Sequence, residues 1–132
     1  MASTRPDSGA SVGFRLPRSH RIYRSDDIRE LMRRGKRKRT SSLDVFFAAS
    51  PASHCRFGVV VPKHRHRIVD RNRVKRRIRE LARTRLLPEL RGTGLELDVL
   101  VRARREAYEA DFDALAIEIE QIGRRLCSSG RS

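Results

Sequence analysis

The stretch Arg71–Arg83, RNRVKRRIRELAR, combines six arginines and one lysine with a repeat of apolar residues. At about 100° per residue, Val74, Ile78 and Leu81 fall on one narrow stripe of a helix. An apolar stripe of this kind packs against a core, so the cationic side of the helix points outward. The outward face consists of Asn72, Arg76, Arg79 and Arg83, with Lys75 beside them.

The positive charge of the chain is concentrated in two blocks. The 132 residues carry 31 Lys and Arg against 16 Asp and Glu, a net charge of +15. Residues 1–42 contribute +8 and residues 63–85 contribute +9, whereas residues 43–62 are neutral and residues 86–132 carry −2. Charge that only keeps a protein soluble is spread more evenly, so the clustering indicates a binding footprint for a polyanion. We therefore predict that the helix opening at Arg71 binds RNA.

Other partners and compartments fit the sequence less well. No apolar run approaches the ~20 residues that span a membrane, and no segment combines a basic face with exposed large aromatics. The N-terminus has no apolar run of the secretory type. Cys55 and Cys127 show neither disulfide-framework nor metal-binding spacing. We expect reduced thiols in a cytoplasmic protein that has no membrane partner.

The N-terminal third predicts a tail, a helix and a basic run. Residues 1–21 are rich in Ser, Gly, Pro and Arg, and we expect a disordered basic tail there. Ser25, followed by two acids, predicts the N-cap of a short helix that ends at Gly35. The run KRKR at 36–39 is compatible with a nuclear-localisation-like patch, an RNA contact or a charged edge strand. The apolar face of the short helix consists of Ile28, Leu31 and Met32.

Two strands follow the basic run. Residues 43–49 (LDVFFAA) and 56–61 (RFGVVV) are rich in β-branched and aromatic residues, and the intervening SPASHC suits a turn, so we expect a β-hairpin. Phe46 and Phe47 must point to opposite faces of the sheet. One of them belongs to the core, and the other could stack on an unpaired base for about 1–3 kcal/mol. The sequence does not say which.

The segment around the second strand holds imidazole and thiol groups. His54, Cys55, His64 and His66 are metal-ligand types, but their spacing matches no structural zinc pattern. The pattern His-x-His among Lys and Arg is ordinary for a basic loop. We predict no metal site. Because acids are scarce in the basic blocks, we also predict no catalytic residue in this chain.

The C-terminal half predicts the end of the basic helix, a strand and a further helix. Pro88 is expected to stop the basic helix. Residues 95–102 (LELDVLVR) alternate as a strand does, and Asp111 is placed to cap an amphipathic C-terminal helix. We expect a single RNA-binding domain over residues 22–126 and a frayed tail over residues 127–132.

This order of elements, with RNR opening the basic helix, resembles the protein subunit of bacterial ribonuclease P. The resemblance runs through residues 22–126 and is most specific at residues 56–80, RFGVVVPKHRHRIVDRNRVKRRIRE. A strand, a basic connection and the RNR helix start appear there together. The family often has Phe where Ile28 and Met32 stand, so the first helix departs from the family pattern. The positions that match the RNR motif are Arg71, Asn72, Arg73, Lys75, Arg76 and Arg79.

The resemblance implies an α+β fold: an α-β-α sandwich of the ribosomal protein S5 domain 2 type, with a left-handed βαβ crossover through the RNR helix. General handedness rules would predict a right-handed crossover. The resemblance also implies that a catalytic RNA subunit performs Mg²⁺-dependent hydrolysis, while the protein binds that RNA and the 5′ leader of precursor tRNA. We expect Mg²⁺ in the holoenzyme with RNA, no cofactor on the protein alone and no obligatory protein partner.

Two sets of residues are expected to make these contacts. The RNA subunit is expected to contact the six RNR-motif residues and Lys63, and the leader is expected to pass Phe46 and Arg56. The alternative is a small ribosomal protein, or another RNA-binding protein without a processing role, which would share the charge and even the fold. The RNR helix placed directly after a strand and a basic loop favours ribonuclease P.

Overall fold

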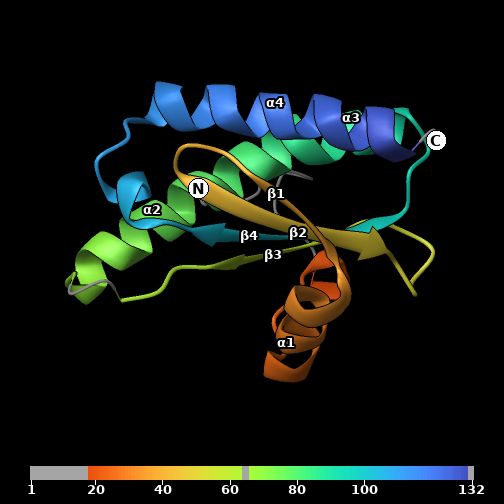
Figure 1. The fold of residues 1–132 in the computed structure, drawn as a ribbon, viewed down its shortest axis with the longest axis horizontal. Coiled ribbons are helices and arrows are strands. Elements are labelled where there is room, and N and C mark those ends of the chain that lie inside the picture. The colour runs from red at the N-terminus through yellow and green to blue at the C-terminus, as the bar shows by residue number, and fades with distance from the viewer. Residues whose placement is uncertain (1–17, 64–65, 131–132) are drawn as a thin grey trace, which may run out of the picture.

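A four-stranded sheet separates helix α1 from helices α2, α3 and α4 (Figure 1). The computed structural model describes residues 18–63 and 66–130. The helices are α1 (Ser25–Arg34), α2 (Ile68–Leu81), α3 (Leu87–Gly92) and α4 (Phe112–Gly130). The strands are β1 (Lys36–Arg39), β2 (Leu43–Ala49), β3 (Arg56–Val60) and β4 (Leu97–Ala103). Shorter helical turns are η1 (Arg18–His20), η2 (Ala82–Leu86) and η3 (Arg105–Tyr108).

The strand order is β1-β2-β4-β3, which makes the predicted hairpin wrong. Strand β4 lies between β2 and β3, antiparallel to β2 and parallel to β3. The first five residues of β2 are all buried, as expected of a strand with neighbours on both sides and layers on both faces. The turn residues between β2 and β3 carry no information about a strand that is inserted from much later in the chain. The run KRKR is an edge strand, which confirms one of its three interpretations.

The two faces of the sheet have separate cores, because neighbouring residues of a strand point to opposite sides. Phe47 belongs to the large core formed with α2, α3 and α4. Phe46 belongs to a small core with Ile22, Leu31 and Leu100 under α1. The α-β-α sandwich is thereby confirmed. In its β3-α2-β4 unit, α2 connects two neighbouring parallel strands. The left-handed sense of this crossover stays a prediction from the resemblance.

Helix α2 docks through the predicted apolar stripe. The exposed fraction of the residues in this stripe is 3% for Val74 and 0% for both Ile78 and Leu81. The helix begins at Ile68, three residues before the RNR motif. Pro88 does not stop the helical path as predicted: a π-helical turn at η2 leads into α3. Pro88 lies in the first turn of α3, where its missing N–H needs no partner in the helix.

The predictions for caps and tails had mixed outcomes. Ser25 is not an N-cap, because the cap position is Arg24 and no side chain caps α1. The cap of α4 is confirmed: the Asp111 carboxylate accepts a hydrogen bond from the Ala114 N–H at 2.8 Å. Most of the predicted N-terminal tail lies outside the described residues, but Arg21 forms an isolated parallel bridge with Phe57. At the other end α4 continues to Gly130, and residues 131–132 lie outside the described residues.

Replacement of Gly58 by Ala tests how closely the N-terminal segment packs on β3. An added Cβ would lie 2.6 Å from the Ile22 carbonyl oxygen and 3.0 Å from a Leu100 methyl carbon. Because backbone must move, we expect Gly58→Ala to lower the free energy of unfolding by about 1–3 kcal/mol. The control is Gly92→Ala, where an added Cβ meets nothing within 4 Å. Urea denaturation measures both variants, and equal stabilities would contradict the close packing.

Candidate nucleic-acid interface

The outward face of α2 presents only part of the predicted RNA-binding set. Asn72, Arg73 and Arg76 are exposed, and Lys63 is exposed in the preceding loop. Asn72 is the fifth residue of the helix, so it does not cap the helix start. The remaining members of the set are half-buried; they are Arg71, Lys75 and Arg79.

Two arginines on the flanks of α2 turn back to the protein backbone. The Arg71 guanidinium donates to the Val61 carbonyl oxygen at 3.5 Å, and the Arg77 guanidinium donates to that of Ala110 at 3.5 Å. These long hydrogen bonds flank the apolar stripe and leave the charges partly solvated. Arg71 therefore differs from Arg73 and Arg76, which point outward.

The loop before α2 is held by an aromatic contact. The ring of His66 stacks on that of Tyr108, with centroids 3.6 Å apart and planes 8° from parallel. The Tyr108 hydroxyl donates to the Pro62 carbonyl oxygen at 2.9 Å. Burial raises the pKa of Tyr108 above its ordinary value. Both contacts fix the chain near Lys63, at the entrance to α2.

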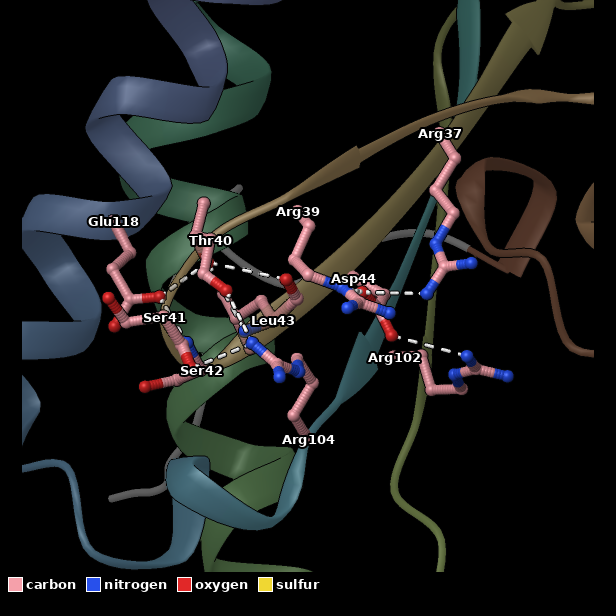
Figure 2. A network of polar contacts seen from close by, with 10 residues as sticks. All are labelled: Arg37, Arg39, Thr40, Ser41, Ser42, Leu43, Asp44, Arg102, Arg104 and Glu118. Atoms are coloured by element: carbon pink, nitrogen blue, oxygen red, sulfur yellow. Dashed lines mark hydrogen bonds and ion pairs between the residues drawn. The ribbon is translucent and has the colours of Figure 1, made fainter.

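A second basic site lies on the sheet face that α1 covers in part. Asp44 is 3% exposed and receives three guanidinium groups: Arg39 at 2.9 Å, Arg102 at 3.2 Å and Arg37 at 3.3 Å. Figure 2 shows that these arginines converge on Asp44 from β1 and β4. The register explains this, because Arg39 and Arg102 are the cross-strand partners of Asp44. One carboxylate among three arginines leaves a local charge of +2.

The carboxylate of Asp44 stays ionised in this cluster. Burial alone favours its protonated form, but the hydrogen bonds from Arg39, Arg102 and Arg37 outweigh burial and lower its pKa. A buried carboxylate that accepts charged hydrogen bonds holds its donors in place. Asp44 thus positions three arginine side chains that are themselves half-exposed.

Phe46 and Arg56, the candidate leader-cleft residues, lie on this same face. Phe46 is 5% exposed, and the guanidinium groups of Arg37 and Arg102 lie over its ring at 5.7 and 5.4 Å from the centroid. Arg56 makes two hydrogen bonds to Asp98, at 2.6 and 2.8 Å, and these raise its pKa. Two guanidinium groups therefore lie over the nearly buried ring of Phe46.

The turn between β1 and β2 is fixed to two other elements. Glu118 of α4 accepts hydrogen bonds from the Thr40 hydroxyl and from the Ser42 N–H, the latter at 2.9 Å. Arg104 donates to the carbonyl oxygens of Thr40 and Ser41 at 2.9 and 3.1 Å. These contacts, drawn in Figure 2, tie the turn between β1 and β2 to α4 and to the residue that follows β4.

Sequence reasoning missed Asp44 and Arg102 as parts of a site. Both lie in apolar strands, and only the alternation of side chains marked them as facing the same way as Phe46. Their convergence depends on the pairing of β2 with β4, which the sequence did not predict.

Residues 18–63 and 66–130 hold neither a metal-binding cluster nor a membrane-spanning helix. No three His, Cys, Asp or Glu side chains gather there, and His64 lies outside this part of the chain. No helix of the described residues is long and apolar enough to cross a membrane.

The chain is similar to known proteins over most of its length. A family model described as Ribonuclease P matches residues 16–127. The ribonuclease P protein component of Syntrophobacter fumaroxidans is 39% identical over 112 residues, covering 79% of this chain and 89% of that protein. That of Acidothermus cellulolyticus is 31% identical over 121 residues, covering 89% and 96%.

Solved structures share the fold. The Staphylococcus aureus RNase P protein aligns with a TM-score of 0.68 at 22% identity, covering 81% of this chain and 94% of that one. The Thermotoga maritima RNase P protein aligns with a TM-score of 0.66 at 23% identity, covering 80% and 96%.

Replacement of Asp44 by Asn tests whether the carboxylate organises the arginines. We expect a loss of about 1–2 kcal/mol in the free energy of unfolding at neutral pH, because three guanidinium groups lose a charged acceptor and their own exposure limits the effect. The folded state lowers the pKa of Asp44, so its contribution is complete above the unfolded pKa, about 4, and is lost as pH falls through the folded pKa.

Urea denaturation at neutral pH and near pH 3 measures this difference between wild type and variant. The gap should be largest at neutral pH and shrink on acidification. Glu109→Gln, at an exposed position, is the control and should change stability by less than about 0.5 kcal/mol. A pH-independent gap would mean that Asn disturbs packing and that the charge of Asp44 is unimportant.

Proposed function

Because this chain belongs to the ribonuclease P protein family, we propose that the exposed face of α2 binds the catalytic RNA and that the sheet face under α1 receives the precursor tRNA leader. As a protein component of ribonuclease P, the chain is a subunit of the enzyme that matures the 5′ ends of tRNA. Membership in this family also favours ribonuclease P over the alternative of a small ribosomal protein.

The proposal that α2 binds RNA rests on the contrast between the buried and the exposed side of this helix. Val74 and Ile78 are buried in the large core, whereas Asn72, Arg73 and Arg76 are exposed. The buried side fixes the orientation of the helix. The exposed side can then neutralise RNA phosphates and release counterions, so that affinity falls steeply with salt.

The sheet face supports the leader proposal through its cluster of guanidinium groups. Arg37, Arg39 and Arg102 surround Asp44 and remain half-exposed, so they can donate to phosphates of a single strand. The ring of Phe46 lies beneath two of them. An unpaired base would reach the ring only after Arg37 or Arg102 moves aside. Phosphate contacts are therefore proposed as the first interaction, with stacking second.

We propose that the chemistry and its Mg²⁺ belong to the RNA and its substrate. Mg²⁺ prefers oxygen ligands, above all carboxylates. On the sheet face both buried carboxylates are paired with arginines, Asp44 with three and Asp98 with Arg56. These donors do not suit a resident metal ion. The protein then contributes binding and orientation, without a catalytic residue or a cofactor of its own.

We also propose a cytoplasmic compartment and no obligatory protein partner. Both Cys55 and Cys127 are free thiols, which fits a reducing cytoplasm. A catalytic RNA and a precursor tRNA account for the two basic sites, so no obligatory protein partner is invoked.

The double variant Arg73→Ala/Arg76→Ala tests the α2 face. We expect affinity for a ribonuclease P RNA transcript to fall about tenfold or more, since each arginine supplies a charge-assisted hydrogen bond. The slope of log affinity against log salt should flatten by about two, one for each phosphate contact. Fluorescence anisotropy titrations at several salt concentrations measure both quantities.

The matched control is Arg124→Ala/Arg125→Ala, which removes two exposed arginines from α4. It should bind nearly as wild type does. An equal loss in both double variants would show that net charge, and not the α2 face, controls binding.

A cleavage assay tests where the chemistry lies. We expect the purified protein to leave a 5′-labelled precursor tRNA intact in Mg²⁺, and to accelerate cleavage by a ribonuclease P RNA when Mg²⁺ is scarce. The physical reason is that the protein neutralises phosphates that Mg²⁺ would otherwise screen. Gel analysis of the products decides, and cleavage at the mature 5′ end without RNA would refute this assignment.

A further inference from the structure

Two arginine side chains form a cover over the ring of Phe46. The guanidinium carbons of Arg37 on β1 and Arg102 on β4 lie 5.7 and 5.4 Å from the ring centroid. Because β2 lies between β1 and β4, the two arginines approach the ring from opposite sides of its strand. The ring is only 5% exposed. A base needs one open face of an aromatic ring to stack on it, so the cover keeps bases away from Phe46.

Asp44 holds both arginines of the cover, as Figure 2 shows. It lies two residues before Phe46 on β2, so both side chains point to the same face of the sheet. The Arg102 guanidinium donates to Oδ2 of Asp44 at 3.2 Å, and that of Arg37 lies 3.3 Å from Oδ1. Strand register places them, because Arg102 is the cross-strand partner of Asp44 and Arg37 is that of Phe46. One buried carboxylate thus closes the cover from both sides.

Helix α1 adds a contact to Arg102. Its guanidinium lies 4.0 Å from the sulfur of Met32, which packs against the small core that contains Phe46. The side chain of Arg102 is 35% exposed, less than that of Arg37 at 45%. Moving Arg102 off the ring would give up a charged hydrogen bond and leave the buried carboxylate with one partner fewer. The closed arrangement is therefore favoured.

A phosphate can bind to the cover without opening it. A guanidinium group has more N–H donors than one carboxylate oxygen can accept. Arg37 and Arg102 can therefore donate to a phosphate of a single strand while they remain on Asp44. Stacking of a base on Phe46 requires that one of them leave. The cover thus separates contacts with the RNA backbone from contacts with its bases.

We propose that Asp44 is a positioning residue that keeps Arg37 and Arg102 over Phe46, so that this face holds the precursor tRNA leader by its phosphates and discriminates little among leader bases. The placement of the leader on this face rests on the proposed function. Asp44 acts only through the two arginines and does not touch the RNA. Contacts with phosphates carry no base information, so the leader is bound without a sequence code.

The test compares two precursor tRNAs that differ only in their leaders. One leader is ordinary, and in the other every nucleotide except the one beside the cleavage site is abasic, so that the phosphates remain. Single-turnover cleavage at rising concentrations of holoenzyme, reconstituted with a ribonuclease P RNA, separates the dissociation constant of each substrate from its cleavage rate. For wild type we expect the two dissociation constants to agree within about twofold, because no base is stacked on the protein.

Two variants open the cover: Asp44→Asn releases both arginines, and Arg102→Ala removes one. In each, the abasic leader should bind about fivefold or more weakly than the ordinary leader, the factor for one stacked base, at an unchanged cleavage rate. Adding Phe46→Leu to Arg102→Ala should remove this difference. The matched control is Arg39→Ala, which also takes a guanidinium from Asp44, whereas the described cations over the ring are Arg37 and Arg102. It should keep the ratio of wild type.

The ratio of two dissociation constants on one protein does not depend on how much of that protein is folded, so lost stability cannot imitate the result. A base dependence in wild type as large as in the variants would overturn the cover. A wild-type ratio in both Asp44→Asn and Arg102→Ala would overturn it as well. Failure of the proposed function is seen separately with mature tRNA. If the protein improves the binding of precursor no more than that of mature tRNA, the leader does not bind the protein, and the inference falls with that proposal.

Discussion

The basic surface of this protein depends on how α2 packs against the sheet. Val74, Ile78 and Leu81 are buried in the large core, each contributing about 1.5–3 kcal/mol by its removal from water. The free energy gained by burying these side chains offsets the electrostatic repulsion among the six arginines and one lysine within Arg71–Arg83. It also decides which cations face solvent and which turn toward the protein. A basic helix without this stripe would expose its charges in every direction and define no binding surface.

The basic side chains of the sheet face, of the outward face of α2 and of the pocket beside β3, lined by Arg21, Lys75 and Arg79, differ in how their charge is neutralised. On the sheet face Asp44 pairs with three arginines and Asp98 with Arg56, so these carboxylates offset part of the positive charge. On the outward face of α2 the charges are solvated by water. In the pocket beside β3 the cations have no acidic partner among the described residues, and burial removes part of their water.

Local patterns predicted the elements well and their arrangement poorly. The apolar stripe of α2 and the Asp111 cap follow from short-range spacing, and the structure confirms them. The run at 36–39 left three interpretations open, of which the structure shows the edge strand. The prediction of a β2–β3 hairpin was wrong because β4, which comes much later in the chain, lies between the two strands and pairs with both. Such long-range pairing buries the central strands, and local spacing does not reveal it. Pro88 was misread because a π-helical turn let the chain stay helical past it.

The sequence by itself determined that the chain has a docked basic helix, a charge confined to two blocks and an α+β order of elements that resembles ribonuclease P proteins. These properties depend on residue type and on periodicity over a few turns. Only the tertiary structure decided that Asp44 gathers arginines from β1 and β4, and that Arg21 meets Lys75 and Arg79 across the edge of β3. The physical reason is that Asp44 and Arg102, like Arg21 and the two α2 cations, are more than fifty positions apart, and that the contacts of Asp44 with β1 depend on the register of the two strands. The apolar stripe determines which side of α2 docks but not where the helix lies on the sheet, and strand register is likewise not encoded in local spacing.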